Sequence, residues 1–251
     1  MSYERGEILK REVNIFRDAL ELSEALATQL INQVKGDQKD DRSFTVALPG
    51  GNTPVIFFSV LTEKYSTSID WNNIHFFWGD ERCVHPDDPE SNYGLARKIL
   101  LNKISVPKIN IHRIRGEDDP QKEAKRYSDV IKTYTRSVNS LPSFDLMILG
   151  LGNDGHTASI FPGNIVSFSS RKLCEVAVHP CSGQKRITIT GKVINNSRRI
   201  IFLVAGESKA RLIEDIFNEK PAATLYPASY VIPVSGNAAW MLDENAAKMI
   251  R

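Results

Sequence analysis

The sequence predicts an α/β fold: a doubly wound, mostly parallel sheet with helices on both faces and a ligand site at the strand carboxyl ends. Three observations lead to this prediction. Short apolar runs typical of buried strands alternate along the chain with segments of helical periodicity. Several runs end in loops rich in Gly, Asp or polar residues, and in open α/β sheets ligands bind at such ends. No repeat or Pro/Gly-rich linker divides the chain, so we expect a single domain over residues 1–251.

The first half of the chain opens with an expected strand at 13–16 and a helix that stops near Gly36. The apolar positions of this helix that fit a 3.6-residue period are Leu20, Ala27, Leu30, Ile31 and Val34. Buried strands are expected at 44–48 and 74–78, with a helix after the first of them. Further helices are expected at 91–101 and from Pro120 to about Arg136.

The second half contains the most apolar strand candidate, 144–149. Shorter strands are expected at 173–178 and 186–190. Another buried strand, 200–205, leads into a helix at 209–217. The tail is expected to form a strand from Trp240 onward and then a short helix through Ala246 and Ala247.

Composition excludes several classes of protein. The chain is 41% hydrophobic and 25% charged, which is typical of a globular protein. Its 32 Lys and Arg against 30 Asp and Glu give a formal charge of +2, so counterion release offers no reason to expect nucleic-acid binding. No apolar run suits a membrane span or a secretory signal. Three cysteines without CxxC spacing, Cys83, Cys174 and Cys181, indicate reduced thiols in a cytoplasmic protein.

The loop Gly50-Gly51-Asn52-Thr53-Pro54 follows the strand at 44–48. Glycines let backbone N–H groups approach an anion, and the start of a helix adds a favourable dipole. Thr53 suits the N-cap and Pro54 the first helical position. Because no Gly-Lys-Ser/Thr follows, a monophosphate fits better than a nucleoside triphosphate. A tight turn without a ligand is the alternative interpretation.

The loop at 150–156 matches the GxGxxG dinucleotide pattern and also contains an acid–base pair. Asp154 would set a carboxylate where a pyrophosphate should bind, which disfavours a dinucleotide, although Glu175 has the spacing that the pattern requires. His156 can accept a proton from water near neutral pH, and Asp154 could orient its ring. We therefore predict an acid–base role, with a surface histidine as the alternative.

Charged residues follow one other strand, lie on another and open the last helix. Asp80-Glu81-Arg82 could bring a carboxylate and a guanidinium to the same pocket, where Arg82 could hold a carbonyl oxygen or an oxyanion. Lys209 could reach a phosphate, and Arg186 is ambiguous taken alone. No metal-ligand spacing occurs, so we expect neither a metal nor a cofactor.

Taken together, these segments resemble the glucosamine-6-phosphate isomerase/6-phosphogluconolactonase family. The matching stretches, in the family's order, are LPGGNTP (48–54), WGDERCVHPDDPESNYGLARKILL (78–101), FDLMILGLGNDGHTASIFPG (144–163), KRITIT (185–190) and VAGESKA (204–210). The chain has Asn52 where the family is expected to carry Ser. The resemblance implies a NagB/RpiA-like fold over the whole chain. We expect the protein in the cytoplasm, as a monomer or a small homo-oligomer.

Within the family, the resemblance favours the lactonases over the amino-sugar deaminases. Phe161 stands just before Pro-Gly, where the deaminases are expected to carry a glutamate, and Arg82 also favours a lactonase. The implied reaction is hydrolysis of 6-phospho-D-glucono-1,5-lactone, a sugar phosphate, in the oxidative pentose phosphate pathway. Alternatives are a deaminase-like isomerase and a sugar-phosphate sensor without catalysis, and a dehydrogenase is weaker still.

The resemblance also implies residue roles. His156 would be the general base, supported by Asp154, and Arg82 would stabilise the oxyanion. The residues expected to hold the substrate and its phosphate are Gly50, Gly51, Asn52, Thr53, Asp80, Arg186 and Lys209. The sequence leaves open whether Glu81, His85, Asn92 or Cys83 takes part.

Overall fold

The computed structural model describes residues 12–37 and 43–250. Its central sheet has six parallel strands in the order β1-β11-β10-β7-β2-β3. Their bounds are β1 Glu12–Phe16, β2 Phe44–Leu48, β3 Ile74–Trp78, β7 Leu146–Leu149, β10 Ile200–Val204 and β11 Ala238–Asp243. The expected parallel α/β sheet is therefore confirmed.

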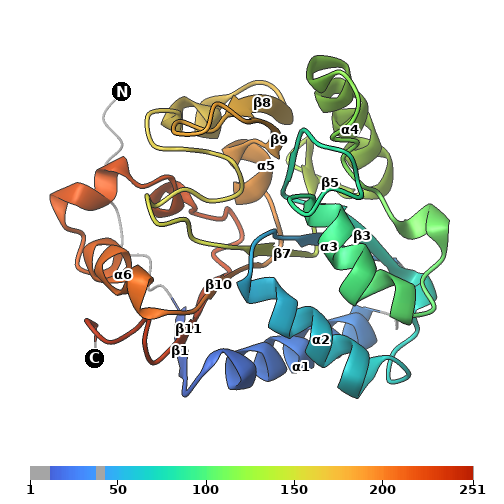
Figure 1. Cartoon of the computed structure of the whole chain (residues 1–251), viewed down its shortest axis with the longest axis horizontal. Coiled ribbons are helices and arrows are strands. Elements are labelled where there is room, and N and C mark those ends of the chain that lie inside the picture. The colour runs from blue at the N-terminus through green and yellow to red at the C-terminus, as the bar shows by residue number, and fades with distance from the viewer. Residues whose placement is uncertain (1–11, 38–42, 251) are drawn as a thin grey trace.

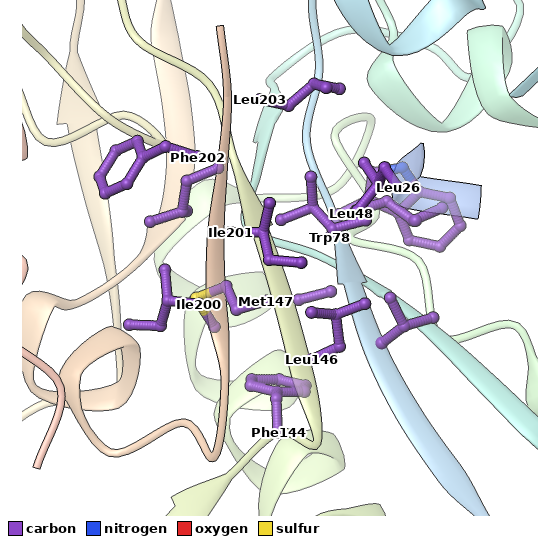
Figure 2. Close-up of a cluster of buried hydrophobic side chains, with 14 of the residues drawn as sticks. Leu26, Leu48, Trp78, Phe144, Leu146, Met147, Ile200, Ile201, Phe202 and Leu203 are labelled. Atoms are coloured by element: carbon purple, nitrogen blue, oxygen red, sulfur yellow. The ribbon is translucent and has the colours of Figure 1, made fainter. Parts of the chain in front are cut away.

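Helices cover both faces of this sheet (Figure 1). The α-helices are α1 Ala19–Asp37, α2 Thr53–Tyr65, α3 Asn92–Ile99, α4 Pro120–Tyr134, α5 Gly191–Asn195 and α6 Ala210–Phe217. Side chains of β10 alternate between the faces: Ile201 and Leu203 point to the side of Leu26 in α1, and Phe202 points away (Figure 2). On that other side Phe202 stacks on Trp240 at 3.8 Å, and Phe217 of α6 meets the Trp240 ring edge-on.

Single residues at the helix starts explain where two helices begin. Ser91 caps α3, because its side chain accepts a hydrogen bond from the N–H of Gly94. Asp119 caps α4 by accepting from the N–H of Lys122, and Pro120 follows at the first helical position. Both helices therefore start at the residues that the sequence indicated.

A second, three-stranded antiparallel sheet, in the order β4-β9-β8, was not predicted. It consists of β4 Asp80–Arg82, β8 Cys174–Val178 and β9 Lys185–Ile189. The segments 173–178 and 186–190 were expected as strands, but not in a separate antiparallel sheet. Residues 80–82 were expected as a loop, because three charged residues lack strand propensity. Pairing with β9 nevertheless makes them a strand.

Other expectations at the element ends were wrong. Helix α4 ends at Tyr134, and Arg136 belongs to the hairpin of β5 Arg136–Val138 and β6 Leu141–Ser143. Gly36 lies inside α1, which runs to Asp37. The side chain of Leu20 is exposed, whereas Leu22, which the pattern did not include, is buried. Ala246 and Ala247 lie in turns rather than in a helix. Short 3₁₀ segments occur at 71–73, 101–103, 108–110, 165–169, 207–209, 221–225 and 227–230.

The topology brings four loops together at one edge. Strands β3, β2, β7 and β10 are consecutive in the sheet and parallel, so their carboxyl ends share an edge. The loops that leave them start at Gly79, Pro49, Gly150 and Ala205. In open α/β sheets, ligands bind at the edge formed by the carboxyl ends of the strands.

Candidate active site

A cleft of about 340 Å³ opens at this carboxyl edge, between the four loops and strand β9. Its lining includes residues from all four loops and the charged residues Asp80, Arg82, Arg186 and Lys209. The predicted site residues that line it are Gly50, Gly51, Asn52, Thr53, Asp80, Arg82, His156, Arg186 and Lys209. Asp154 lies outside the lining and reaches the cleft through His156. The structure thus brings together residues that are up to 159 positions apart in the chain.

The loop after β2 presents open backbone to the cleft. Gly51 has φ 93°, a conformation that favours glycine. The expected N-cap at Thr53 is wrong: Asn52 is the N-cap of α2, and its side chain makes no capping hydrogen bond. Thr53 is instead the first residue of the helix, so Pro54 is the second helical residue and not the first as expected. The first N–H groups of α2 therefore stay unoccupied by the cap side chain, as an anion site requires.

Asn92, whose role the sequence left open, lies against this loop. A Cβ on Gly50 would come within 1.9 Å of the Asn92 side-chain oxygen, so a side chain at this position would displace the Asn92 amide. Asn92 Nδ2 donates to the carbonyl oxygen of Asp80 at 2.9 Å. This amide therefore joins the loop after β2 to strand β4 and lines the cleft itself.

The loop after β7 holds an imidazole in one orientation. Asp154 Oδ1 accepts from the backbone N–H of His156 at 3.1 Å and lies 2.5 Å from its ring Nδ1. Gly152 donates its N–H to the carbonyl oxygen of His156, and a Cβ on Gly152 would lie 2.1 Å from the ring. Because Nδ1 faces Asp154, Nε2 is the ring nitrogen available to the cleft.

The Asp154 carboxylate stays ionised beside this ring. Burial acts to raise the pKa of Asp154, but the hydrogen bonds and charge of His156 outweigh it and lower the pKa to about 2. The His156 ring also packs on Phe161, with centroids 4.9 Å apart. A permanently charged carboxylate and a buried aromatic ring thus fix the imidazole from two sides.

Strand β4 separates two carboxylates with different contacts. Asp80 accepts from the hydroxyl of Ser159 at 2.6 Å, which ties it to the loop after β7. Glu81 points away from the cleft and accepts from the N–H groups of Asn92 and Tyr93 at the start of α3. Burial raises the pKa of Glu81 to about 7, against the opposing effect of these hydrogen bonds. Asp80 therefore links β4 to the loop after β7, and Glu81 links β4 to the start of α3.

Three cations line the cleft, and none of them forms an ion pair with a described residue. Arg82 donates from Nη1 to the carbonyl oxygen of Glu90 at 2.6 Å, and its buried Nε has no acceptor among the described residues. Burial lowers the pKa of Arg186, and the nearby charge of Arg82 lowers it further. Burial also lowers the pKa of Lys209, which donates to Asn153. Two guanidinium groups and an ammonium held this way create a field that attracts an anion.

The carboxylate of Asp243, at the end of β11, fixes the position of the Lys209 turn. Both of its oxygens accept from the N–H of Gly206 at 3.0 Å, and Oδ1 also accepts from Ala246 at 2.7 Å. Gly206 has φ 99° and starts the turn that carries Lys209. The motifs gave no indication of this contact, because Asp243 follows Lys209 by more than thirty residues.

Two other candidates lie outside the cleft lining. The side chain of His85 is 66% exposed and pairs with Asp87 at 3.4 Å. Burial raises the pKa of the Cys83 thiol to about 11, which disfavours a thiolate nucleophile. Within residues 12–37 and 43–250, no three His, Cys, Asp or Glu side chains gather as metal ligands would. Over the same ranges, no helix has the length and apolar character needed to cross a membrane.

Comparison with known proteins gives the same family as the motifs. The family model described as glucosamine-6-phosphate isomerases/6-phosphogluconolactonase matches residues 17–240. The 6-phosphogluconolactonase of Aggregatibacter actinomycetemcomitans is 44% identical over 207 residues, which cover 82% of this chain and 87% of that protein.

Two solved structures resemble this chain over almost its whole length. The 6-phosphogluconolactonase of Trypanosoma brucei has a TM-score of 0.86 and 26% identity, over 96% of this chain and 99% of that one. A monomeric glucosamine-6-phosphate deaminase has a TM-score of 0.80 at 22% identity, over 95% of this chain and 99% of that one. The second likeness shows a shared fold.

Proposed function

Because the chain belongs to the glucosamine-6-phosphate isomerase/6-phosphogluconolactonase family, we propose that its cleft hydrolyses 6-phospho-D-glucono-1,5-lactone to 6-phosphogluconate. This is a reaction of the oxidative pentose phosphate pathway. The observation that carries the proposal is the meeting of an oriented His156–Asp154 pair with three cations and an open glycine loop in one cleft.

The 6-phosphate end of the substrate would lie against the start of α2. There the backbone N–H groups of residues 50–53 can donate to phosphate oxygens, and the helix dipole favours the negative charge. Arg186 and Lys209 supply two positive charges that line the same cleft. The Arg186 guanidinium lies over the Phe161 ring, 5.6 Å from its centre, and this cation–π contact helps to position it.

The lactone end would lie at His156. Nε2 accepts a proton from a water molecule while the water oxygen bonds to C1 of the lactone. The carbonyl oxygen becomes an oxyanion, which the Arg82 guanidinium stabilises. When the bond between C1 and the ring oxygen breaks, the imidazolium returns its proton to that ring oxygen. Asp154 stays ionised throughout and stabilises the charged imidazole.

The deaminase alternative is disfavoured by the surroundings of His156. The ring that packs on His156 belongs to Phe161, which is 4% exposed and carries no ionisable group. A deaminase of this family is expected to hold a glutamate at that position to assist ring opening. A sensor without catalysis has no need of a carboxylate-oriented imidazole facing the ligand, so hydrolysis accounts for more of the site.

The direct test is turnover of freshly prepared 6-phosphogluconolactone by the purified chain, measured as acid release or by coupling to 6-phosphogluconate oxidation. The lactone opens spontaneously, so the rate without protein is subtracted. We expect turnover well above this background and no ammonia from glucosamine 6-phosphate. Ammonia release without lactone hydrolysis would replace the proposal with the deaminase function, and binding without either reaction would favour the sensor.

The remaining expectations about the whole protein stay predictions. Buried apolar residues from Leu22 to Ala247 form one cluster, which supports a single lactonase domain over residues 1–251. All three cysteines are free, in keeping with the predicted cytoplasmic location. A monomer or a small homo-oligomer is still expected.

A further inference from the structure

A second depression in the surface, larger than the catalytic cleft, lies beside helix α4. We call it the basic groove. It has a volume of about 750 Å³, within the range of small-molecule sites. One wall is α4, the second is the β5–β6 hairpin and the third is the segment 171–175. It shares no lining residue with the catalytic cleft, so it is a separate feature of the molecule.

The groove concentrates positive charge. Its lining contains two carboxylates, Asp129 and Glu175, and five cationic side chains: Lys125, Lys132, Arg136, Arg171 and Lys172. Within the lining the excess is three positive charges, and one of the five cations, Arg136, is paired at 3.1 Å with Asp145 outside the lining. Positive charges gathered in a concave surface raise the local concentration of anions.

Most of these cations are not neutralised by the protein. Lys125, Arg171 and Lys172 form no ion pair or side-chain hydrogen bond with any of the described residues. Glu175 is occupied by the hydroxyl groups of Ser167 and Ser170, at 3.0 and 2.5 Å. Asp129 is 3.4 Å from Lys132, a partner on its own helix. Three free cations therefore face the groove from two of its walls.

The floor of the groove is apolar. Ala124, Leu173 and Cys174 are each less than 10% exposed, and Leu141 and Pro142 of the hairpin continue the same surface. Burial raises the pKa of the Cys174 thiol to about 12, so this sulfur stays uncharged and acts as part of the floor. A ligand that suits both parts carries several negative charges for the walls and an apolar or aromatic body for the floor.

We propose that the basic groove binds a phosphorylated organic molecule of the nucleoside polyphosphate class. Its phosphates would lie between Lys125 of α4 and the pair Arg171 and Lys172, and its base would rest on the apolar floor. The groove borders β8, and the neighbouring strand β9 carries Arg186, one of the residues proposed to hold the substrate phosphate.

The test uses adenosine triphosphate as the probe and titration calorimetry as the measurement, with saturating 6-phosphogluconate present to occupy the catalytic cleft. We expect one additional site per chain. The double variant Arg171→Ala/Lys172→Ala should weaken its binding by about tenfold or more. The matched control Lys98→Ala/Lys103→Ala also removes two exposed cations, both outside the groove, and should bind as the unmodified chain does. Lactone turnover without nucleotide should be unchanged in both variants.

Three results would overturn the proposal. Equal binding by the two double variants would mean that the groove is not the site. Loss of all nucleotide binding in the presence of 6-phosphogluconate would assign the binding to the catalytic cleft. Inorganic tripolyphosphate that binds as tightly as the nucleotide would show a general anion surface without a place for an organic body. None of these results bears on lactone hydrolysis, so the two proposals fail independently.

Discussion

The two glycine-rich loops of the cleft leave neighbouring parallel strands, β2 and β7, yet they are built for different tasks. The loop at 49–54 makes no side-chain hydrogen bond at its helix cap and leaves its backbone donors open. The loop at 150–156 folds back on itself through the Asp154 carboxylate, which accepts from the backbone and the ring of His156. Similar sequence patterns thus produce an open loop and a closed one.

The comparison shows that glycine serves two physical purposes here. Gly51 supplies a backbone conformation, with φ 93° and no atom within 4 Å of the place where a Cβ would lie. Gly152 supplies empty space, because any Cβ there would overlap the His156 ring. We expect changes in the first loop to weaken substrate binding and to raise KM. Changes in the second loop should lower kcat, since they disturb the group that moves the proton.

The largest effect is expected for His156→Ala. Loss of the general base should lower kcat by about 10²- to 10⁴-fold with KM within a few-fold of the unmodified value. Steady-state kinetics with the spontaneous rate subtracted measure both constants. His85→Ala is the matched control, because this exposed histidine lies outside the cleft lining and should keep full activity. If the His156→Ala variant kept its activity, His156 would not be the general base and the loop at 150–156 would not have the catalytic role.

The next largest effect is expected for Gly152→Ala. The new methyl group would lie 2.1 Å from Nδ1 of His156 and would push the ring away from Asp154. We expect kcat to fall by about 10- to 10²-fold, as for a misplaced catalytic group. Gly36→Ala adds a methyl group in open space on α1 and should leave kcat unchanged. If Gly152→Ala raised KM alone, the closed loop would be a binding loop.

A smaller effect is expected for Gly51→Ala in the open loop. Its φ of 93° costs a residue with a Cβ about 1–2 kcal/mol, so the backbone should shift and its donors should turn from the phosphate. This predicts a rise in KM of about tenfold with kcat within about twofold. A fall in kcat at constant KM would contradict the division of tasks between the loops.

Acid pH should affect the stability of the fold through a buried histidine, His112, that lies beside strand β3. His112 is 8% exposed and lies 2.9 Å from His75, and burial lowers the pKa of His112 to about 4. Between pH 6.5 and 4 the His112 imidazole is therefore protonated in the unfolded chain and neutral in the folded chain, so its contribution to the stability of the fold decreases as the pH falls. From pH 7 to pH 5 the contribution of His112 to the free energy of unfolding should fall by about 1–2 kcal/mol, whereas Glu81, whose pKa is raised to about 7, contributes in the opposite direction. Urea unfolding of the unmodified chain and of His112→Gln measures the His112 contribution as the difference between them.

The variant His112→Gln supplies the control for this prediction. From pH 7 to pH 5 its free energy of unfolding should fall less, or rise more, than that of the unmodified chain, and its kcat at pH 7 should be unchanged because His112 lies outside the cleft lining. Equal pH dependence of stability in the two chains would show that His112 is not the source of the acid loss.

Sequence patterns predicted the central sheet well and its surroundings less well. Apolar runs such as 200–205 can only be buried, so their place in the sheet follows from composition alone. Strand β4 consists of Asp80, Glu81 and Arg82, and only its pairing with β9 makes it a strand. The β5–β6 hairpin and α5 are short elements whose existence depends on tertiary contacts.

The sequence allowed the residues of the site to be predicted, but not most of the contacts between them. Most of the predicted cleft residues lie in segments that directly follow a strand, and Arg186 lies in β9 itself. The contact of Asn92 with Gly50 and the anchoring of Gly206 by Asp243 depend on residues brought together by folding. Such contacts leave no spacing in the sequence, and only the three-dimensional arrangement reveals them.

The central claim is that the open loop and the closed loop act on opposite ends of one substrate. A crystal structure with 6-phosphogluconate bound would test it most directly. We predict the phosphorus atom beside the N–H groups of residues 50–53, with Arg186 and Lys209 around it, and the C1 carboxylate within hydrogen-bond distance of His156 Nε2. A phosphate seated at His156, or a C1 carboxylate outside the reach of that nitrogen, would contradict the account.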